Sequence, residues 1–203
     1  HIKKSYDAGV RGVEELLHVA CHPDILDAVE QVMGPDLVLW GSQVFSKPAG
    51  DGMAIPWHQD GQYWPLRPLR TVTVWIAIDP VTVENGCMRV IPGTHRDGLL
   101  EHESSDDQSL ALNQGLPHVD ESTAPDVELE PGQFSLHDVM LIHGSNANTS
   151  GRRRCGWAIR YMPATSLFDR SIPPIRVAQN QVIDFSQRPI WLVRGEDRAG
   201  NDF

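Results

Sequence analysis

From residue 37 onward, the sequence consists of short runs of strand-forming residues, each closed by turn-forming residues. Such runs lie at 37–47, 70–79, 87–91, 126–130, 133–142 and 154–162. The turns between them draw on 17 Gly and 15 Pro, as in Pro48-Ala49-Gly50 and Pro131-Gly132. Many short strands with turns between them are typical of a β-sandwich or barrel and argue against repeated βαβ units. The sequence therefore predicts a mainly β fold.

Helical periodicity is confined to the first 34 residues. Leu16, Leu17 and Ala20 recur at helical spacing, and Pro23 opens a second periodic segment that Gly34 ends. We expect one domain over 1–203, with helical support at 1–34, a β core at 35–165 and an extended C-terminal segment at 166–203. The polar stretch 97–125 lacks periodicity and is expected to be an insertion or lid. A first residue other than Met suggests that a helical piece is missing.

Charge and cysteine usage exclude several classes of function. The 17 Lys+Arg and 27 Asp+Glu give a net charge of −10, so no nucleic-acid partner is expected. No run approaches the roughly 18 apolar residues of a membrane span, and we expect no membrane partner. Three cysteines without CxxC spacing indicate a reducing compartment, which we take to be the cytoplasm. We expect a small-molecule substrate, and the sequence does not predict an oligomeric state.

Nine histidines prompt a search for metal ligands. An extended backbone at 56–61 would place His58 and Asp60 on one face, because alternate residues of a strand point the same way. His143, expected at the end of a later strand, would complete a set of two histidines and one carboxylate. That set leaves one face of an octahedral metal open and is diagnostic of non-haem iron(II) oxygenases. A surface turn plus a core histidine would explain the same residues, and His137 competes as the distal ligand.

An arginine follows the distal histidine at hairpin distance. If the metal's cosubstrate is 2-oxoglutarate, its far carboxylate needs a cation, best a guanidinium that pairs with both oxygens. Arg154 lies eleven residues after His143, and a hairpin would bring it back beside the metal. Arg152 and Arg153 are rivals, and a solvated charge run is the alternative interpretation of all three.

Three motifs, in this order, resemble the phytanoyl-CoA dioxygenase-like family of Fe(II)- and 2-oxoglutarate-dependent oxygenases. They are W-H-Q-D at 57–60, V-x-V-E-N-G-C-M-R-V-I-P-G-T-H at 81–95 and L-I-H-G-S-x-x-N-x-S-x-x-x-R at 141–154. The resemblance runs from about Pro35 to Met162. It implies a double-stranded β-helix (jelly-roll, cupin-like) core with supporting N-terminal helices. It also implies Fe(II) as the metal, and 2-oxoglutarate and O2 as cosubstrates.

The resemblance further implies roles at the metal. His58, Asp60 and His143 match the iron ligands of the family. Halogenases of the wider group have Ala or Gly in place of the carboxylate, so the presence of Asp60 favours hydroxylation. The segments 85–86 and 92–95 match family signatures that we interpret as structural turns, with His95 making a structural contact.

For the cosubstrate, the resemblance implies a polar pocket around the far carboxylate. Arg154 matches the arginine that binds this C5 carboxylate. Thr73 and Ser145 match residues that assist it, and we assign Lys47, at the end of the first strand, to the same site.

Substrate contacts are expected from side chains that share the pocket. Gln43 lies on the same face of the first strand as Lys47, and Arg160 has the same parity as Arg154. With Trp64, which follows the first ligands, they form our substrate-binding set. An inward arginine favours a small polar or anionic metabolite, and an acyl-CoA is the alternative. A cupin-like metal protein without 2-oxoglutarate chemistry and a catalytically silent binding domain also stay open.

Overall fold

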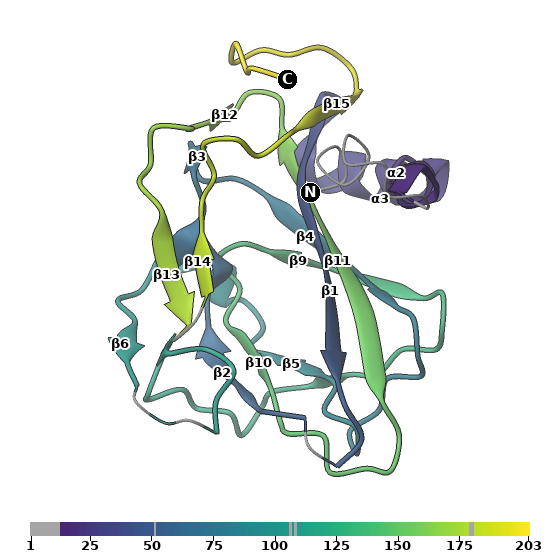
Figure 1. Cartoon of the computed structure of the whole chain (residues 1–203), viewed down its shortest axis with the longest axis vertical. Helices are drawn as coiled ribbons and strands as arrows, with labels where there is room; N and C mark the ends of the chain where they lie inside the picture. Colours follow the sequence, from purple (N-terminus) through teal and green to yellow (C-terminus); the bar gives the residue numbers. More distant parts are fainter. Residues whose placement is uncertain (1–12, 51, 106, 108, 179–180) are drawn as a thin grey trace.

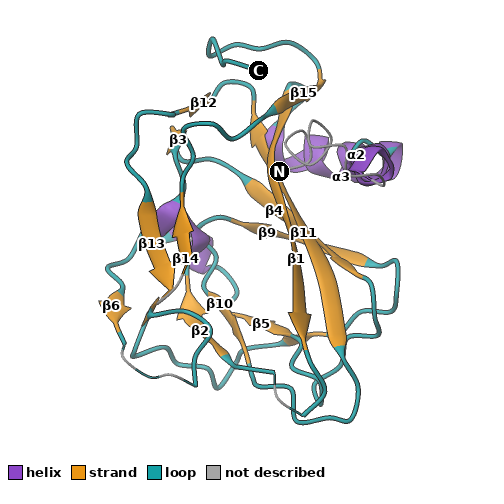
Figure 2. Cartoon of the chain, viewed as in Figure 1, coloured by secondary structure: helices purple, strands orange, loops and turns teal. Residues whose placement is uncertain are grey.

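The computed structural model describes residues 13–50, 52–105, 107, 109–178 and 181–203, and these form mainly antiparallel strands. A five-stranded sheet has the order β15-β1-β11-β4-β9, and a four-stranded sheet has the order β2-β10-β5-β8 (Figures 1 and 2). Early and late strands alternate as neighbours, as in a jelly roll. The predicted mainly β, double-stranded β-helix (jelly-roll, cupin-like) fold is therefore confirmed. The large sheet contains β1 (Leu37–Lys47), β4 (Val72–Ala77), β9 (Phe134–Asp138), β11 (Arg154–Pro163) and β15 (Trp191–Arg194); the small sheet contains β2 (Ile55–His58), β5 (Met88–Val90), β8 (Asp126–Val127) and β10 (His143–Ser145).

The remaining elements are helices and short strand pairs. Both expected N-terminal helices are present, and residues 1–12 of the expected helical support lie outside the described residues. None of the described helices is long and apolar enough to span a membrane. Cys21, Cys87 and Cys155 are free thiols. The elements are α2 (Val13–Ala20), α3 (Pro23–Met33), the 3-10 helices η1 (Asp60–Tyr63) and η2 (Thr94–Arg96), and the pairs β3 (Leu66–Arg67) with β12 (Leu167–Phe168), β6 (Glu103–Ser104) with β7 (Gln114–Gly115), and β13 (Ile175–Ala178) with β14 (Gln181–Ile183).

The large sheet separates an apolar core from a cavity. On β11, the side chains of Trp157, Ile159 and Tyr161 pack in one cluster with buried residues of α3. Figure 1 shows α3 beside this sheet. The alternate residues of β11, including Ala158 and Arg160, line the cavity on the opposite face. Both faces of this strand are thus covered, which explains why nine of its ten residues are buried.

The segment from residue 133 to His143 differs from the sequence-based expectation, because it forms two strands and not one. We expected one strand over 133–142 with His143 at its end, but β9 ends at Asp138 and His143 begins β10 in the other sheet. The Asp138 side chain accepts a hydrogen bond from Met140 N (2.8 Å), which turns the chain at this point. The strands that carry His143 and Arg154 likewise do not pair as the expected hairpin. β10 pairs with β2 and β5, whereas β11 pairs with β1 and β4 in the other sheet.

One glycine in β11 is required by close packing between sheet neighbours. A Cβ atom on Gly156 would lie 2.0 Å from Trp75 Cζ2 and 2.2 Å from Trp75 Cη2. We expect Gly156→Ala to lower the free energy of unfolding by about 3 kcal/mol or more, at the upper end for overpacked cores. Urea unfolding measures this. Gly151→Ala is the control, since its Cβ meets nothing within 4 Å among the described atoms, and it should change stability by less than about 0.5 kcal/mol. Equal midpoints for the two variants would contradict the prediction.

Candidate metal centre and its cavity

Two histidines and one aspartate converge between the two sheets. The ligand atoms of His58, Asp60 and His143 all lie within 4.8 Å of one another. His58 ends β2 and His143 begins β10, and these two residues are direct partners in the antiparallel register. The structure therefore brings the three predicted ligands together from segments more than 80 residues apart.

Asp60 reaches this point by a different route from the one expected. It is not on a strand with His58 but opens η1, and Gln59 separates η1 from the end of β2. The turn from strand to 3-10 helix leaves His58 Nε2 3.5 Å from Asp60 Oδ1. The prediction of a shared strand face was wrong, although the two side chains meet as predicted.

The hydrogen bonds of the two histidines leave the correct nitrogens for a metal. His58 Nδ1 lies 2.9 Å from Pro56 O, and His143 Nδ1 lies 2.9 Å from Leu141 O. A carbonyl oxygen only accepts, so each Nδ1 carries the proton and donates it. Each Nε2 is then the nitrogen that faces the site, where His58 Nε2 meets Asp60 Oδ1 and would exchange its proton for a metal ion. A backbone partner sets the orientation of each ring, as is usual for metal-binding histidines.

The electrostatics of the site also fit a metal ion. Burial, and then the neighbouring His58, lower the pKa of His143 to about 3. Burial alone raises the pKa of Asp60, but hydrogen bonding to His58 and nearby positive charge outweigh it, so this pKa lies below its usual range. At neutral pH the site therefore offers a neutral imidazole and a carboxylate, the protonation states that metal binding requires. The residues present fit a divalent ion held on one face.

His137, the rival distal ligand, lies close to the triad without joining it. Its Nε2 is 3.9 Å from Asp60 Oδ2, and its ring centroid is 4.8 Å from that of His143. It comes from β9 in the opposite sheet and is buried. The geometry favours His143 over His137 as the third ligand.

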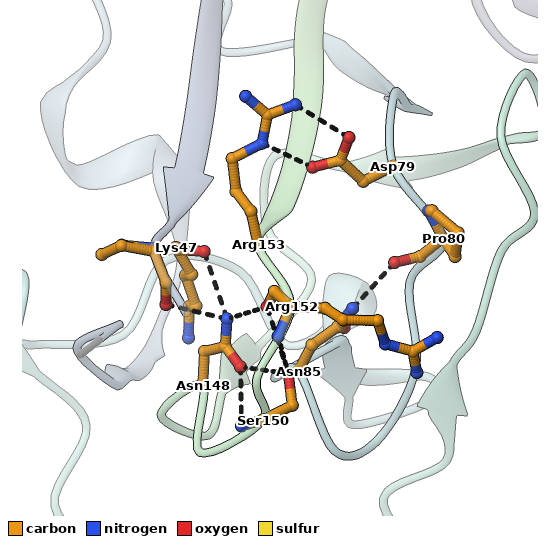
Figure 3. Close-up of polar contacts among 9 residues, drawn as sticks. Lys47, Asp79, Pro80, Asn85, Asn148, Ser150, Arg152 and Arg153 are labelled. Carbon is orange, nitrogen blue, oxygen red and sulfur yellow. Dashed lines mark hydrogen bonds and ion pairs between the residues drawn. The ribbon is translucent and has the colours of Figure 1, made fainter. Parts of the chain in front are cut away.

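The triad lies in the wall of a cavity of about 340 Å³. Arg154 lines this cavity and is 3% exposed, which distinguishes it from its rivals. Arg152 is exposed, and the exposed Arg153 pairs with Asp79 at 2.8 and 2.9 Å (Figure 3). Of the three arginines, Arg154 is the one that a cavity ligand can meet.

Lys47 contacts Ser145 and neighbours Arg154, but among these three residues only Ser145 and Arg154 are in the cavity lining. Lys47 is the register partner of Arg154. Lys47 Nζ donates to Ser145 Oγ (2.8 Å) and to the carbonyl oxygen of Asn146. Burial, together with the charge of Arg154, lowers the pKa of Lys47 to about 7. The Arg154 guanidinium also lies 5.4 Å from the Trp75 ring centroid.

The loop that carries this subsite is held by Asn148, to which the sequence analysis assigned no role. Its buried Nδ2 donates to the carbonyl oxygens of Lys47 (3.2 Å), Pro48 (2.9 Å) and Arg152 (2.7 Å), while Oδ1 accepts from Ser150 (Figure 3). One side chain thus connects the end of β1 to the start of β11. The N-x-S pattern of the third motif is the sequence feature that corresponds to it.

The expected substrate residues lie elsewhere on the cavity wall. Gln43, Trp64 and Arg160 all line the cavity. Thr73, which we expected beside Arg154, lines it too, but the register places Thr73 opposite Arg160. At about 3.3 Å per residue, the six-residue step from Arg160 to Arg154 is about 20 Å along β11. This placement does not favour joint binding of one carboxylate by Thr73 and Arg154.

Gln59 is a second residue that sequence reasoning missed. In the sequence it lies between His58 and Asp60, and its side chain is fully buried. Its Nε2 donates to the carbonyls of Gly98 (2.8 Å) and Met140 (2.7 Å), and its Oε1 accepts from Leu100 N (2.7 Å). Gln59, which follows His58 in the chain, therefore connects the 97–125 segment to the turn that precedes His143. That segment also contributes Ala111 and Leu112 to the cavity wall.

The motifs interpreted as structural behave as turns. The side chain of Asn85 bonds Thr82 N (2.9 Å) and Pro80 O (2.8 Å), and Gly86 adopts φ +79°. Thr94 Oγ1 accepts from Ile142 N (3.0 Å), which holds the residue directly before His143. His95 itself is exposed.

The fold and the site match one class of protein, the jelly-roll enzymes that bind a non-haem metal through two histidines and one carboxylate. The model of the phytanoyl-CoA dioxygenase family matches residues 2–156, and the chain belongs to this family.

Individual relatives and solved structures agree with this assignment. A probable phytanoyl-CoA dioxygenase of Caenorhabditis elegans is 36% identical over 209 residues, covering 88% of this chain and 67% of the relative. The human peroxisomal phytanoyl-CoA dioxygenase is 31% identical over 149 residues, covering 70% of this chain and 44% of the relative. The non-heme monooxygenase ThoJ, in its apo structure, has TM-score 0.69 and 32% identity, covering 89% of this chain and 61% of that one. The non-heme alpha ketoglutarate dependent carbocyclase SnoK from nogalamycin biosynthesis has TM-score 0.64 and 28% identity, covering 76% and 62%.

Proposed function

We propose that this chain hydroxylates an unactivated C–H bond of a small polar or anionic metabolite, using Fe(II), 2-oxoglutarate and O2. The overall reaction converts R–H, 2-oxoglutarate and O2 into R–OH, succinate and CO2. One observation carries the proposal: a buried cluster of two histidines and one carboxylate shares a cavity with the buried cation Arg154. When bound at His58, Asp60 and His143, iron(II) would supply the oxygen chemistry.

The chain's own residues would bind, orient and exclude water. Arg154 would pair with the C5 carboxylate of 2-oxoglutarate, and Ser145 would add a donor at the same end. Lys47, bonded to Ser145, would add positive charge behind it. Trp75 and Phe45, which also line the cavity, would keep water from the reacting centre. No acid–base residue is required in this scheme.

Because the pKa of Lys47 is lowered to about 7, we predict that cosubstrate binding depends on pH near neutrality. Its pKa of about 7 means that the ammonium is present below pH 7 and is lost as the pH rises through that value. Because only the charged form attracts a carboxylate, we expect the Kd for 2-oxoglutarate to rise up to about tenfold between pH 6.5 and pH 8.5. Isothermal titration at a series of pH values measures this. The Kd of Lys47→Met should stay flat over the same range, and an equal pH dependence in both proteins would contradict the prediction.

Cavity size favours a small substrate over an acyl-CoA. A volume of about 340 Å³ is at the low end of the roughly 300–1,000 Å³ of ligand sites, and the cosubstrate must share it. The acyl-CoA alternative would need most of the nucleotide to lie outside the cavity. The cytoplasmic location also stays a prediction, and the human relative is named as peroxisomal.

Succinate formation tests the proposed function. The protein is incubated with Fe(II), 2-oxoglutarate and ascorbate under air, with and without panels of small carboxylic acids, amino acids and acyl-CoAs. We expect succinate formation that depends on Fe(II) and is stimulated by a member of the small-molecule panels. Stimulation by acyl-CoAs alone would favour the alternative substrate. The absence of both succinate and Fe(II) binding would favour a catalytically silent domain, whereas metal binding without any 2-oxoglutarate binding would favour the cupin-like alternative.

A further inference from the structure

Three polar residues form one row across the cavity face of the large sheet. Arg160 on β11 is the register partner of Thr73 on β4, and Thr73 is the register partner of His137 on β9. All three line the cavity. Neighbouring residues in such a row lie about 4.5–5.5 Å apart, so their side chains face one common volume.

Each member of this row has a buried polar atom without a partner. Arg160 Nε, Thr73 Oγ1 and His137 Nδ1 make no hydrogen bond to any residue in the described part of the chain. More than about nine in ten buried polar groups in folded proteins are paired, so three unpaired groups in one row are a marked concentration of unused hydrogen-bonding capacity.

The row is separate from the proposed cosubstrate subsite. Arg160 and Arg154 are six residues apart on one strand, or about 20 Å between Cα atoms. We therefore assign Arg154 and Arg160 to different parts of the cavity wall. The row instead adjoins the metal ligands, because His137 Nε2 lies 3.9 Å from Asp60 Oδ2.

Two tryptophan rings hold the guanidinium of Arg160 in place. Its guanidinium carbon lies 5.0 Å from the Trp64 ring centroid and 5.9 Å from that of Trp40. Trp40 is itself fixed, fully buried and donating from Nε1 to Thr71 Oγ1 (2.9 Å). Asp60 is the one acidic side chain among the residues known to line the cavity, and a metal would occupy it. Asp60 attracts the charge of Arg160, and a metal ion held by Asp60 would offset that attraction.

We propose that the row of Arg160, Thr73 and His137 binds a carboxylate of the primary substrate. Arg160 supplies the charge, and Thr73 and His137 supply hydrogen-bond donors. This inference rests on the proposed function and specifies its substrate class as a small carboxylic acid. Because the row adjoins Asp60, the carbon that is hydroxylated lies within a few bonds of the carboxylate.

The test compares acids with their neutral amides. The protein is loaded with Ni(II) and N-oxalylglycine, an analogue of 2-oxoglutarate, so that the cosubstrate subsite is filled. Hexanoate, benzoate and their amides are then titrated by calorimetry. A charged hydrogen-bonded contact predicts at least about tenfold tighter binding of an acid than of its amide.

Variants locate the preference for the acid. Arg160→Met, which keeps an apolar chain between the two tryptophans, should abolish it, and Thr73→Val should reduce it. The exposed Arg152→Met is the matched control and should retain it. Thermal melting checks that each variant is folded.

Three results would overturn the proposal. They are equal affinity for acids and amides in the wild type, an acid preference that survives Arg160→Met, and loss of N-oxalylglycine binding in Arg160→Met, which would assign the row to the cosubstrate. Failure of the wild type to bind Ni(II) and N-oxalylglycine would instead contradict the proposed function. The same titrations on the metal-free protein would still decide whether the row selects a carboxylate.

Discussion

His143→Ala is expected to abolish Fe(II)-dependent conversion of 2-oxoglutarate to succinate. Loss of a group that merely orients a metal ligand costs about 10–100-fold in metal affinity or activity, so loss of a ligand should cost more than about 100-fold. The side chain is buried, and its Nδ1 is already bonded to Leu141 O, so Nε2 is the atom that is lost to the metal. Calorimetric titration with Fe(II) under argon and a succinate assay under air measure the two effects.

His95→Ala is the control for this prediction. His95 belongs to a motif of the same resemblance but is exposed, and it should keep metal affinity and turnover within about twofold. His137→Ala adds a sharper comparison, since His137 lies beside Asp60 without joining the ligand group. If His137→Ala lost the metal while His143→Ala kept it, the assignment of the distal ligand would be wrong.

Arg154→Met is expected to raise the KM for 2-oxoglutarate by about 100-fold or more. A guanidinium that pairs with both oxygens of a carboxylate makes two charge-assisted hydrogen bonds, each worth about 1.5–3 kcal/mol, or about tenfold to 100-fold in affinity. Arg154 is 3% exposed, so water compensates little for its loss. Arg154→Lys keeps the charge but not the planar geometry, and it should raise KM by about tenfold. Initial rates over a range of 2-oxoglutarate concentrations measure both values.

Arg153→Met is the matched control for Arg154. It removes a guanidinium from the adjacent position, but Arg153 pairs with Asp79 on the surface. An exposed ion pair contributes about 0–1 kcal/mol, so we expect a small change in stability and an unchanged KM. If the KM of Arg154→Met for 2-oxoglutarate equalled the wild-type value, the assignment of Arg154 to the cosubstrate would be wrong. This conclusion does not depend on whether the metal site is correct.

Much of the fold was predictable because its determinants are local. α3 begins at Pro23 and is capped by Gly34, as the sequence predicts. The turn at Asn85 and Gly86 forms because of the side-chain hydrogen bond of Asn85 and the positive φ of Gly86. Alternate side chains of a strand point to the same face, so Arg154 and Arg160 on β11 both line the cavity, as their even spacing predicts. Where a competing local interaction was overlooked, the prediction failed: the Asp138 side chain turns the chain after β9 and divides the expected strand.

Local sequence patterns were enough to predict the mainly β architecture, the supporting helices and the three residues that converge, His58, Asp60 and His143. Periodicity and turn preferences involve a few neighbouring residues, and the three motifs identify the site residues by their order along the chain. Which residues line the same part of the cavity is known from the three-dimensional structure alone. The register between β11, β4 and β9 places Thr73 with Arg160 and His137, not with Arg154. Strand register depends on side-chain packing between segments distant in sequence, such as Gly156 against Trp75, and no local pattern contains it.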